Sequence, residues 1–259
     1  MNHTTYKNIQ FEIDRDSAFL TIDHPPVNIL DISTMEEMND AISSLKGSSS
    51  VKVLVITSNG EKAFSAGVDV SEHTEDKAGK MLQVFHDIFR NLLALDQVTV
   101  AACKGLTLGG GCEVAIFCDL ILAADNLKIG QPEIKLAVIP PIALLILPRL
   151  LGLKRAADLL LTGRVISAQE AEKIGLVNRV VPLGSFDEEL GNFIQPFSEL
   201  SLVGIKYSKR GISLGLETGF VEALDQIEKI YLDELMSSQD AHEGLQAFMD
   251  KRAPVWKNE

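Results

Sequence analysis

The sequence predicts an α/β fold of parallel strands joined by helices, and three observations favour it. Its 259 residues, 46% of them hydrophobic, are enough to bury a large core. Apolar runs of strand length alternate with segments of helical periodicity through most of residues 9–125. No glycine-rich or serine-rich linker interrupts this alternation. Such an order of elements places helices against a mostly parallel sheet by default.

The first predicted elements are a β-hairpin and a helix. The segments IQFEID (9–14) and AFLTID (18–23) alternate apolar and polar residues on either side of a short turn, which is typical of a hairpin. A helix is expected over MEEMNDAISSLK (35–46), because its apolar positions have helical spacing and acidic residues occupy its first turn. Ser33 or Thr34 is the expected N-cap.

The order of strand and helix then repeats through the middle of the chain. Each predicted strand is a short apolar run, and each predicted helix is an amphipathic or apolar segment that follows it. In order, these elements are a strand at 51–58, a helix at about 77–95, a strand at 98–105, a helix from about 111 and a strand at 120–125.

After Pro182 the pattern becomes almost entirely helical. Three successive segments, 185–200, 201–216 and 218–238, carry helical periodicity. We therefore expect a single folded unit with a core over residues 1–195 and a helical region over residues 196–259.

Composition and charge exclude several classes of function. The formal net charge of −12 repels the phosphates of nucleic acids and of anionic membranes. The first thirty residues have no basic start followed by an apolar core, and the longest apolar candidate, 137–148, is too short to span a bilayer. Cys103, Cys112 and Cys118 lack the spacing of metal ligands. We expect a cytoplasmic protein with buried free thiols, and neither nucleic acid nor membrane as a partner.

Two glycine turns are candidates for binding an anion. The turn at 109–111 allows a close backbone approach, and the unpaired N–H groups of the helix that begins there can receive a developing oxyanion. In KAFSAGVDV, Gly67 could bend the chain and expose the N–H of Val68 as a second donor. Glycine turns before helices are common, so an ordinary turn with a helix cap is the alternative.

Two isolated glutamates accompany these turns. Glu113 lies in the first turn of the predicted helix, and Glu133 follows Pro132 in an apolar setting. Desolvation would raise the pKa of Glu133, so that it could act as an acid while a better-solvated neighbour stays ionised as a base. The alternative is that each glutamate only caps a helix or pairs with a surface base.

No other catalytic pattern in the sequence competes with the two glycine turns and the two glutamates. The sequence has no G-x-S-x-G elbow, no histidine-rich or cysteine-rich metal cluster and no G-x-G-x-x-G fingerprint. His73 and His86 follow the first glycine turn and could face a pocket, although a solvated or core histidine is the commoner use. We expect no metal ion at the site.

In combination, five segments resemble the enoyl-CoA hydratase/isomerase, or crotonase, family. Each motif is weak alone, but their order and spacing cover nearly the whole chain. The resemblance implies a crotonase-like spiral of repeated ββα units, a helical C-terminal trimerisation layer and commonly a hexamer built from two trimers. The segments are KAFSAGVDV (62–70), GLTLGGGCEVAIFCDLILAAD (105–125), IGQPEIKLAVIP (129–140), LLLTGRVISAQEAEKIGLVNRVV (159–181) and EGLQAFMDKR (243–252).

The resemblance also implies roles for individual residues. The backbone N–H groups of Val68 and Gly110 would form an oxyanion hole for a thioester oxygen. Glu113 and Glu133 match both glutamates of the family's hydratases, which hold the attacking water and exchange protons with the substrate carbon. Because members that isomerise or hydrolyse often lack one of these glutamates, retention of both favours hydration. No cofactor is expected, since CoA is part of the substrate.

Four further residues match positions of the family that contact CoA. Ser65 and Ala66 resemble the backbone contacts to the adenine portion. Phe248 and Lys251 match C-terminal positions that trimers present to a neighbouring subunit's ligand. Lys251 would offset ligand phosphate charge, although a solvated helix lysine is an equal alternative.

One segment departs from the family's usual pattern. Where common hydratases have a glycine-rich turn after the Glu133 motif, this chain reads VIPPIALLILPRL (138–150). A rigid, apolar wall that includes Pro141 and Leu144 could suit a ring better than a straight acyl chain, or could be ordinary packing. With this departure, the chain looks most like the cyclohexa-1,5-diene-1-carbonyl-CoA hydratases within the family.

Overall fold

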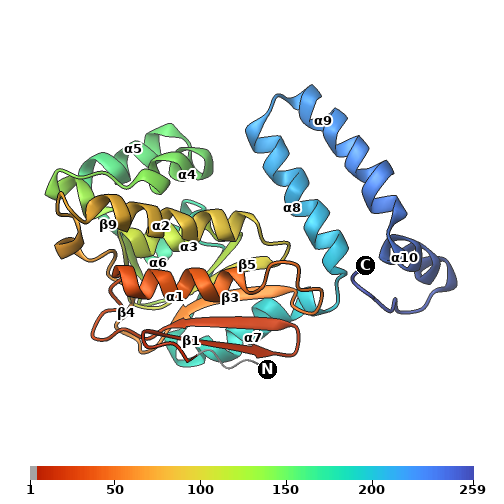
Figure 1. The fold of residues 1–259 in the computed structure, drawn as a ribbon, viewed down its shortest axis with the longest axis horizontal. Helices are drawn as coiled ribbons and strands as arrows, with labels where there is room; N and C mark the ends of the chain where they lie inside the picture. The colour runs from red at the N-terminus through yellow and green to blue at the C-terminus, as the bar shows by residue number, and fades with distance from the viewer. Residues whose placement is uncertain (1–4) are drawn as a thin grey trace.

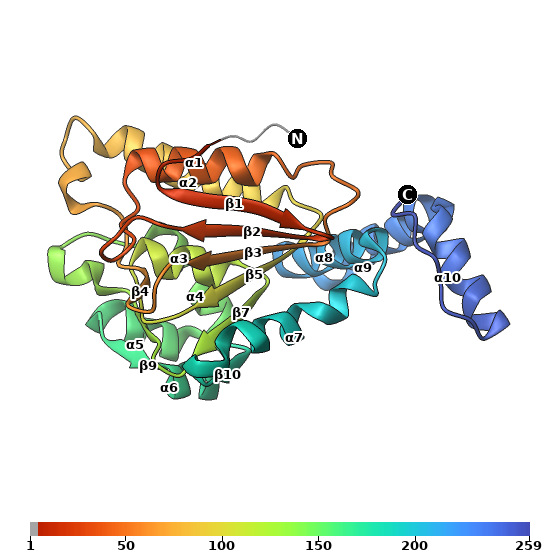
Figure 2. The same cartoon turned by 90° about the horizontal axis from the view of Figure 1, so that it is seen from below.

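The computed structural model describes residues 5–259, which form two β-sheets surrounded by helices (Figure 1). The larger sheet has the strand order β1-β2-β3-β5-β7-β10, and Figure 2 shows these strands side by side. Neighbouring strands in it are parallel except for β1 and β2, which form the predicted hairpin. The strands are β1 (Ile9–Asp14), β2 (Ser17–Ile22), β3 (Val53–Ser58), β5 (Val98–Cys103), β7 (Leu120–Ala124) and β10 (Arg179–Val181).

The smaller sheet alternates with the larger one along the chain. Its strands, in the order β4-β6-β8-β9, are parallel except where β9 pairs with β8. Strands β3, β5 and β7 of the larger sheet are each followed by a strand of the smaller sheet and then by helical structure, so the predicted ββα repeat is confirmed. The smaller sheet comprises β4 (Ala63–Ser65), β6 (Leu106–Leu108), β8 (Lys128–Gly130) and β9 (Val165–Ser167).

The first helix, α1 (Ile32–Ser43), begins earlier than the sequence predicts. Its N-cap is Asp31, whose side chain accepts a 2.8 Å hydrogen bond from the Thr34 N–H. The prediction of Ser33 or Thr34 as N-cap is therefore wrong. The Asp31 carboxylate accepts from the free N–H of Thr34 and the Glu72 carboxylate from that of Ile32, and both predicted capping residues lie inside the helix.

The helices of the core lie on both faces of the larger sheet. The predicted helices at about 77–95 and from about 111 are confirmed as α2 (Ala78–Leu93) and α3 (Gly110–Phe117). One buried cluster joins the sheet to α1, α2 and α3, and a second joins its other face to α7. The remaining core helices are α4 (Pro141–Leu151), α5 (Leu153–Thr162), α6 (Ala168–Lys173) and α7 (Phe186–Ser198), together with the short 3-10 helices η1 (Val70–Glu72), η2 (Pro132–Leu136) and η3 (Leu183–Ser185).

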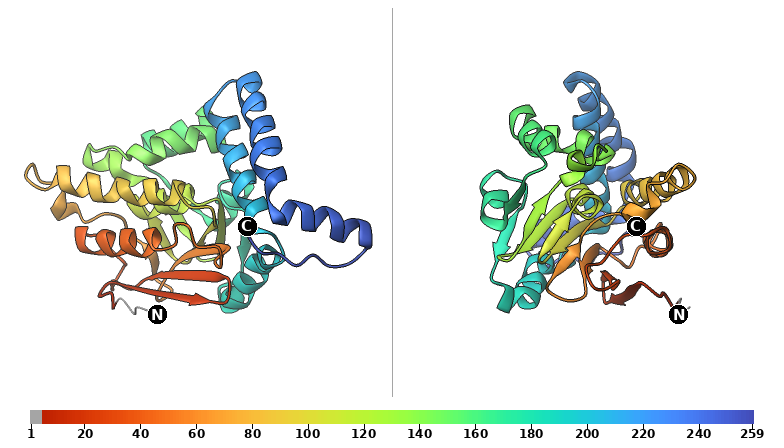
Figure 3. Two further views of the ribbon diagram at one scale, coloured as in Figure 1. Left: turned by 45° about the vertical axis from the view of Figure 1, so that its right-hand side comes forward. Right: turned by 90° about the vertical axis from the view of Figure 1, so that its left-hand side faces the viewer.

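The C-terminal region is helical, as predicted. It contains α8 (Leu202–Glu217), α9 (Phe220–Lys229) and α10 (Gln239–Asp250), with the short η4 (Ile230–Glu234) and η5 (Leu235–Ser237) between α9 and α10. Figures 1 and 3 show α8 and α9 side by side, leading away from the two sheets. The boundary predicted between residues 195 and 196 falls inside α7, which packs on the sheet through Phe186, Leu190 and Ile194.

Cys103, Cys112 and Cys118 are buried free thiols, as expected. In residues 5–259, no helix combines the length and the apolar character that crossing a bilayer requires.

Candidate functional site

The two glycine turns lie against each other at the edge of the smaller sheet. Gly67 has φ of +106°, and a β-carbon on it would lie 3.0 Å from the Leu108 carbonyl oxygen and 3.4 Å from the Gly110 nitrogen. Gly109 also has positive φ, +53°. Only glycine adopts such backbone angles at low cost, and only glycine leaves room for this approach. The residues that follow the two turns are therefore neighbours in space.

The N–H groups of Val68 and Gly110 stand at these turns. Leu30 forms hydrogen bonds on both sides of Val68, donating to the Gly67 carbonyl (3.0 Å) and accepting from the Asp69 N–H (3.2 Å). Because alternate residues of an extended strand direct their polar groups to opposite edges, the Val68 N–H points away from Leu30. Gly110 is the first residue of α3, ahead of the first hydrogen bond inside that helix. The two candidate donors thus lie on touching segments.

Glu113 is held by the beginning of another helix. It is only 3% exposed, and its Oε1 accepts hydrogen bonds from the N–H groups of Ile142 (2.8 Å) and Ala143 (3.0 Å) in the first turn of α4. Burial raises the pKa of Glu113 to about 7, opposed by these two bonds and assisted by the negative charge of Glu133. The carboxyl therefore titrates near neutral pH.

Glu133 lies beside the second glycine turn. It belongs to η2, and a β-carbon on Gly109 would lie 2.9 Å from Glu133 Oε1. As predicted, burial raises its pKa, to about 7. The expected contrast between a dry acid and a better-solvated one is wrong, because α4 covers Glu113 and buries it more deeply than Glu133.

The raised pKa of Glu113 has a consequence for stability. Between pH 4.5, the ordinary pKa, and about pH 7, Glu113 keeps a proton in the folded protein that it releases in the unfolded chain. The contribution of Glu113 to the free energy of unfolding is therefore full at low pH and is lost as the pH rises through 7. From pH 5 to pH 7.5, we expect the native protein to lose about 2 kcal/mol of unfolding free energy that Glu113→Gln does not lose. Urea unfolding of both proteins measures this difference. An equal pH dependence in the two would show that Glu113 is ionised throughout the range.

Gln131 is a site residue that the sequence reasoning missed. It is 1% exposed, and with its amide nitrogen directed to Glu133 it donates to Oε1 at 3.0 Å and to Oε2 at 3.1 Å. These bonds orient the carboxyl toward the glycine turn. The sequence feature that could have indicated it is a polar side chain directly before Pro132 and two residues before Glu133.

The residues predicted to wall the pocket lie next to Glu113. Pro141 is the first residue of α4, and Leu144, 39% exposed, lies one turn further along. The same turn of α4 provides the two N–H donors to Glu113. An apolar helix end therefore borders one of the two carboxyl groups.

Ser65 and Ala66 lie on the approach to the first glycine turn. Ser65 ends β4 and is fully buried, and its Oγ accepts a 3.1 Å hydrogen bond from the Gly67 N–H. The N–H of Ala66 donates to the Val27 carbonyl at 2.9 Å. The Ala66 N–H is therefore already paired and is not the backbone group that the predicted CoA contact would use.

Within one chain, Phe248 and Lys251 lie away from the glycine turns and the two glutamates. Phe248 is 84% exposed on α10, and Lys251 caps the end of that helix. Figures 1 and 3 show α10 beyond the α8–α9 pair, at a distance from α3 and α4.

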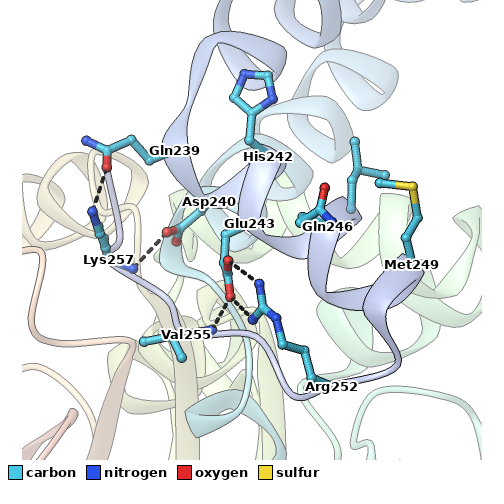
Figure 4. Close-up of a pocket in the computed structure, with 10 residues that line it drawn as sticks. Gln239, Asp240, His242, Glu243, Gln246, Met249, Arg252, Val255 and Lys257 are labelled. Carbon is cyan, nitrogen blue, oxygen red and sulfur yellow. Dashed lines mark hydrogen bonds and ion pairs between the residues drawn. The ribbon is translucent and has the colours of Figure 1, made fainter.

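A separate groove lies between α10 and the C-terminal tail (Figure 4). Its polar side chains pair with one another or with the backbone: Arg252 makes two hydrogen bonds to Glu243, and Asp240 accepts from the Lys257 N–H. These contacts fasten the tail to α10. The groove contains neither candidate glutamate.

The two histidines have different surroundings. His73 is exposed, and its Nδ1 lies 3.0 Å from the Asp69 carbonyl. His86, on α2, is half-buried, and its buried Nε2 has no hydrogen-bond partner in residues 5–259. Desolvation lowers the pKa of His86, so its ring favours the neutral form.

Comparison with known proteins shows similarity along nearly the whole length of the chain. Residues 12–259 match the family described as enoyl-CoA hydratase/isomerase. A probable enoyl-CoA hydratase of Mycobacterium bovis is 36% identical, over 96% of this chain and 98% of that protein. The cyclohexa-1,5-dienecarbonyl-CoA hydratase of Thauera aromatica is 34% identical, over 95% of each. The crystal structure of enoyl-CoA hydratase from Bacillus anthracis superposes with a TM-score of 0.92 at 32% identity, covering 98% of this chain and 100% of that one. The chain described here is a member of the enoyl-CoA hydratase/isomerase family.

Proposed function

We propose that the protein adds water to a carbon–carbon double bond conjugated to the thioester of an acyl-CoA. The observation that carries the proposal is the presence of a buried carboxyl, Glu113, and a partly buried one, Glu133, each with a pKa raised to about 7, beside the glycine turns that carry the Val68 and Gly110 N–H groups. A group with a pKa near the working pH can both accept and donate a proton. Two fixed N–H donors stabilise the negative charge that develops on the thioester oxygen when water attacks the β-carbon.

In this proposal the two glutamates divide the proton transfers. Glu113 chiefly holds the water and takes one of its protons as the carbon–oxygen bond forms. The electron pair of the double bond moves to the thioester oxygen, which the Val68 and Gly110 N–H groups bind. Glu133 chiefly returns a proton to carbon, and the thioester carbonyl is restored. No separate cofactor takes part, since CoA belongs to the substrate.

We propose a cyclic dienoyl thioester, cyclohexa-1,5-diene-1-carbonyl-CoA, as the substrate. Water would attack the ring carbon β to the thioester, a dienolate would form, and the proton would return at the far end of the conjugated system, giving 6-hydroxycyclohex-1-ene-1-carbonyl-CoA. The apolar start of α4, with Pro141 and Leu144, supports a preference for a ring. Similarity to the T. aromatica protein, which is named for this substrate, supports it as well. This reaction would place the protein in the anaerobic degradation of aromatic compounds by the benzoyl-CoA route.

The enzymatic alternative is a linear-chain enoyl-CoA hydratase or an enoyl-CoA isomerase. It is favoured by the slightly higher identity, 36%, to the M. bovis protein named only as a probable enoyl-CoA hydratase. A third candidate is a member that binds acyl-CoA without turnover, if the Pro140–Pro141 segment closes the pocket. Retention of both glutamates opposes this third candidate.

A substrate panel tests the proposal. We expect kcat/KM for the cyclic dienoyl-CoA to exceed that for crotonyl-CoA, with the hydroxylated ring product identified by mass spectrometry. Leu144→Ala should lower this ratio by removing part of the apolar wall, and Leu145→Ala, on the more exposed side of α4, is its control. Hydration of crotonyl-CoA alone would refute the cyclic substrate. Binding of both thioesters without turnover would refute the hydratase.

We also propose that the protein acts in the cytoplasm as a homotrimer or a dimer of trimers. A neighbouring subunit would then bring Phe248 and Lys251 to the CoA bound through Ser65 and Ala66. Exposed apolar side chains on α8 and α9 support burial of this layer between subunits. Light scattering after gel filtration should give three or six times the mass of one chain. The exposed apolar side chains on α8 and α9 are those of Ile212, Leu216, Phe220, Val221 and Leu224.

A further inference from the structure

Ser65 is a fully buried polar residue situated between the two segments that carry the candidate N–H donors. It ends β4, two residues before the bend at Gly67. Its register partner in the smaller sheet is Thr107 of β6, the strand that leads into the second glycine turn. One side chain therefore lies next to both turns.

The hydroxyl of Ser65 holds the first turn. Its Oγ accepts the 3.1 Å hydrogen bond from the Gly67 N–H, a local contact across two residues that fixes the backbone between them. Gly67 has φ of +106°, and its carbonyl accepts from the Leu30 N–H. With both polar groups of Gly67 occupied, the peptide that carries the Val68 N–H has a fixed direction.

The same side chain supports the second turn. A β-carbon on Gly111 would lie 2.6 Å from Ser65 Cβ and 2.9 Å from Ser65 Oγ, so the first turn of α3 rests directly on the serine. Gly111 follows Gly110, the residue whose N–H is the second candidate donor. The position of α3 relative to the first turn therefore depends on what occupies position 65.

We infer that Ser65 is a positioning residue that sets the spacing and direction of the Val68 and Gly110 N–H groups through its side-chain hydroxyl. The inference rests on the proposed function, because it assigns these donors to a thioester oxygen. It differs from the CoA contact expected of this residue, which involves only its backbone. Donors to a developing charge must be held within a fraction of an ångström, and a buried side chain that contacts both segments provides this constraint.

The variant Ser65→Ala removes the hydroxyl and keeps the β-carbon against Gly111. We expect kcat for the better of crotonyl-CoA and the cyclic dienoyl-CoA to fall about tenfold to a hundredfold, with KM changed less than about twofold. Ser58→Ala is the matched control, since Ser58 is also a buried serine and its hydroxyl has no hydrogen-bond partner in the described residues. This control should keep the kcat of the unsubstituted protein.

A spectroscopic measurement separates positioning from a general loss of structure. Binding of butyryl-CoA labelled with ¹³C at the thioester carbonyl should shift the carbonyl stretch to lower frequency in the unsubstituted protein and in Ser58→Ala. The shift should be clearly smaller in Ser65→Ala at saturating ligand. Equal shifts and equal kcat in all three proteins would overturn the inference. If the unsubstituted protein neither shifts the carbonyl nor hydrates a thioester, the proposed function itself fails.

Ser65→Cys keeps the inference testable if the alanine variant does not fold. A thiol is a weaker acceptor than a hydroxyl, so kcat and the carbonyl shift should lie between those of the unsubstituted protein and of Ser65→Ala. If folded Ser65→Cys has the same kcat and the same carbonyl shift as the unsubstituted protein, the result counts against a role for the hydroxyl hydrogen bond.

Discussion

Glu133→Gln is expected to lower kcat for hydration about a thousandfold, because the amide cannot exchange the proton that the substrate carbon must receive. The substitution keeps the size of the side chain, and the neighbouring Gln131 can still donate to the new amide oxygen. Affinity for butyryl-CoA, measured by calorimetry, should change less than about twofold, because the thioester contacts proposed above belong to the backbone.

The exposed Glu12→Gln on β1 is the control for this variant and should keep full activity. A Glu133→Gln protein with activity within tenfold of the unsubstituted protein would exclude Glu133 as the proton donor. Loss of activity together with retained affinity would exclude the acyl-CoA-binding protein without turnover.

Gly67→Ala is expected to lower kcat about a hundredfold or more. The new methyl group would lie 3.0 Å from the Leu108 carbonyl oxygen and 3.4 Å from the Gly110 nitrogen, so the two turns must separate. Loss of one well-placed donor to an oxyanion costs about a hundredfold to a thousandfold in rate. Steady-state kinetics and the carbonyl frequency of bound butyryl-CoA should change together.

Gly60→Ala separates crowding from backbone strain. Gly60 has a similar positive φ, +78°, but a β-carbon there meets no atom within 4 Å. Both variants should lose about 1–2 kcal/mol of stability through the strained backbone, whereas only Gly67→Ala should lose activity. Equal activity of the two variants would show that the approach of the two turns does not matter for the reaction.

Local patterns in the sequence are sufficient to predict many of the strands and helices of the core. The hairpin follows from strict alternation in two short segments, and β3, β5 and β7 follow from apolar runs bounded by polar residues. The start of α3 next to Glu113 follows from three consecutive glycines. Each of these features depends on residues close together in the chain, which is why the sequence alone indicates them.

The surroundings of the glutamates depend on contacts between distant residues. Glu113 accepts hydrogen bonds from Ile142 and Ala143, 29 and 30 residues away, and nothing in either segment alone indicates that α4 begins against this carboxyl. The expected difference in solvation between the two acids fails for this reason. The N-cap of α1 is a smaller case, since Asp31, Ser33 and Thr34 are all suitable capping residues and the backbone path decides among them.

A crystal structure of the protein with bound butyryl-CoA tests the central claim most directly. The thioester oxygen should lie about 2.7–3.1 Å from both the Val68 and the Gly110 nitrogen, with the carboxyls of Glu113 and Glu133 next to the α- and β-carbons. A thioester oxygen that lies beyond hydrogen-bond distance of both nitrogens would contradict it. So would carboxyls of Glu113 and Glu133 that lie in two separate cavities rather than along one acyl chain.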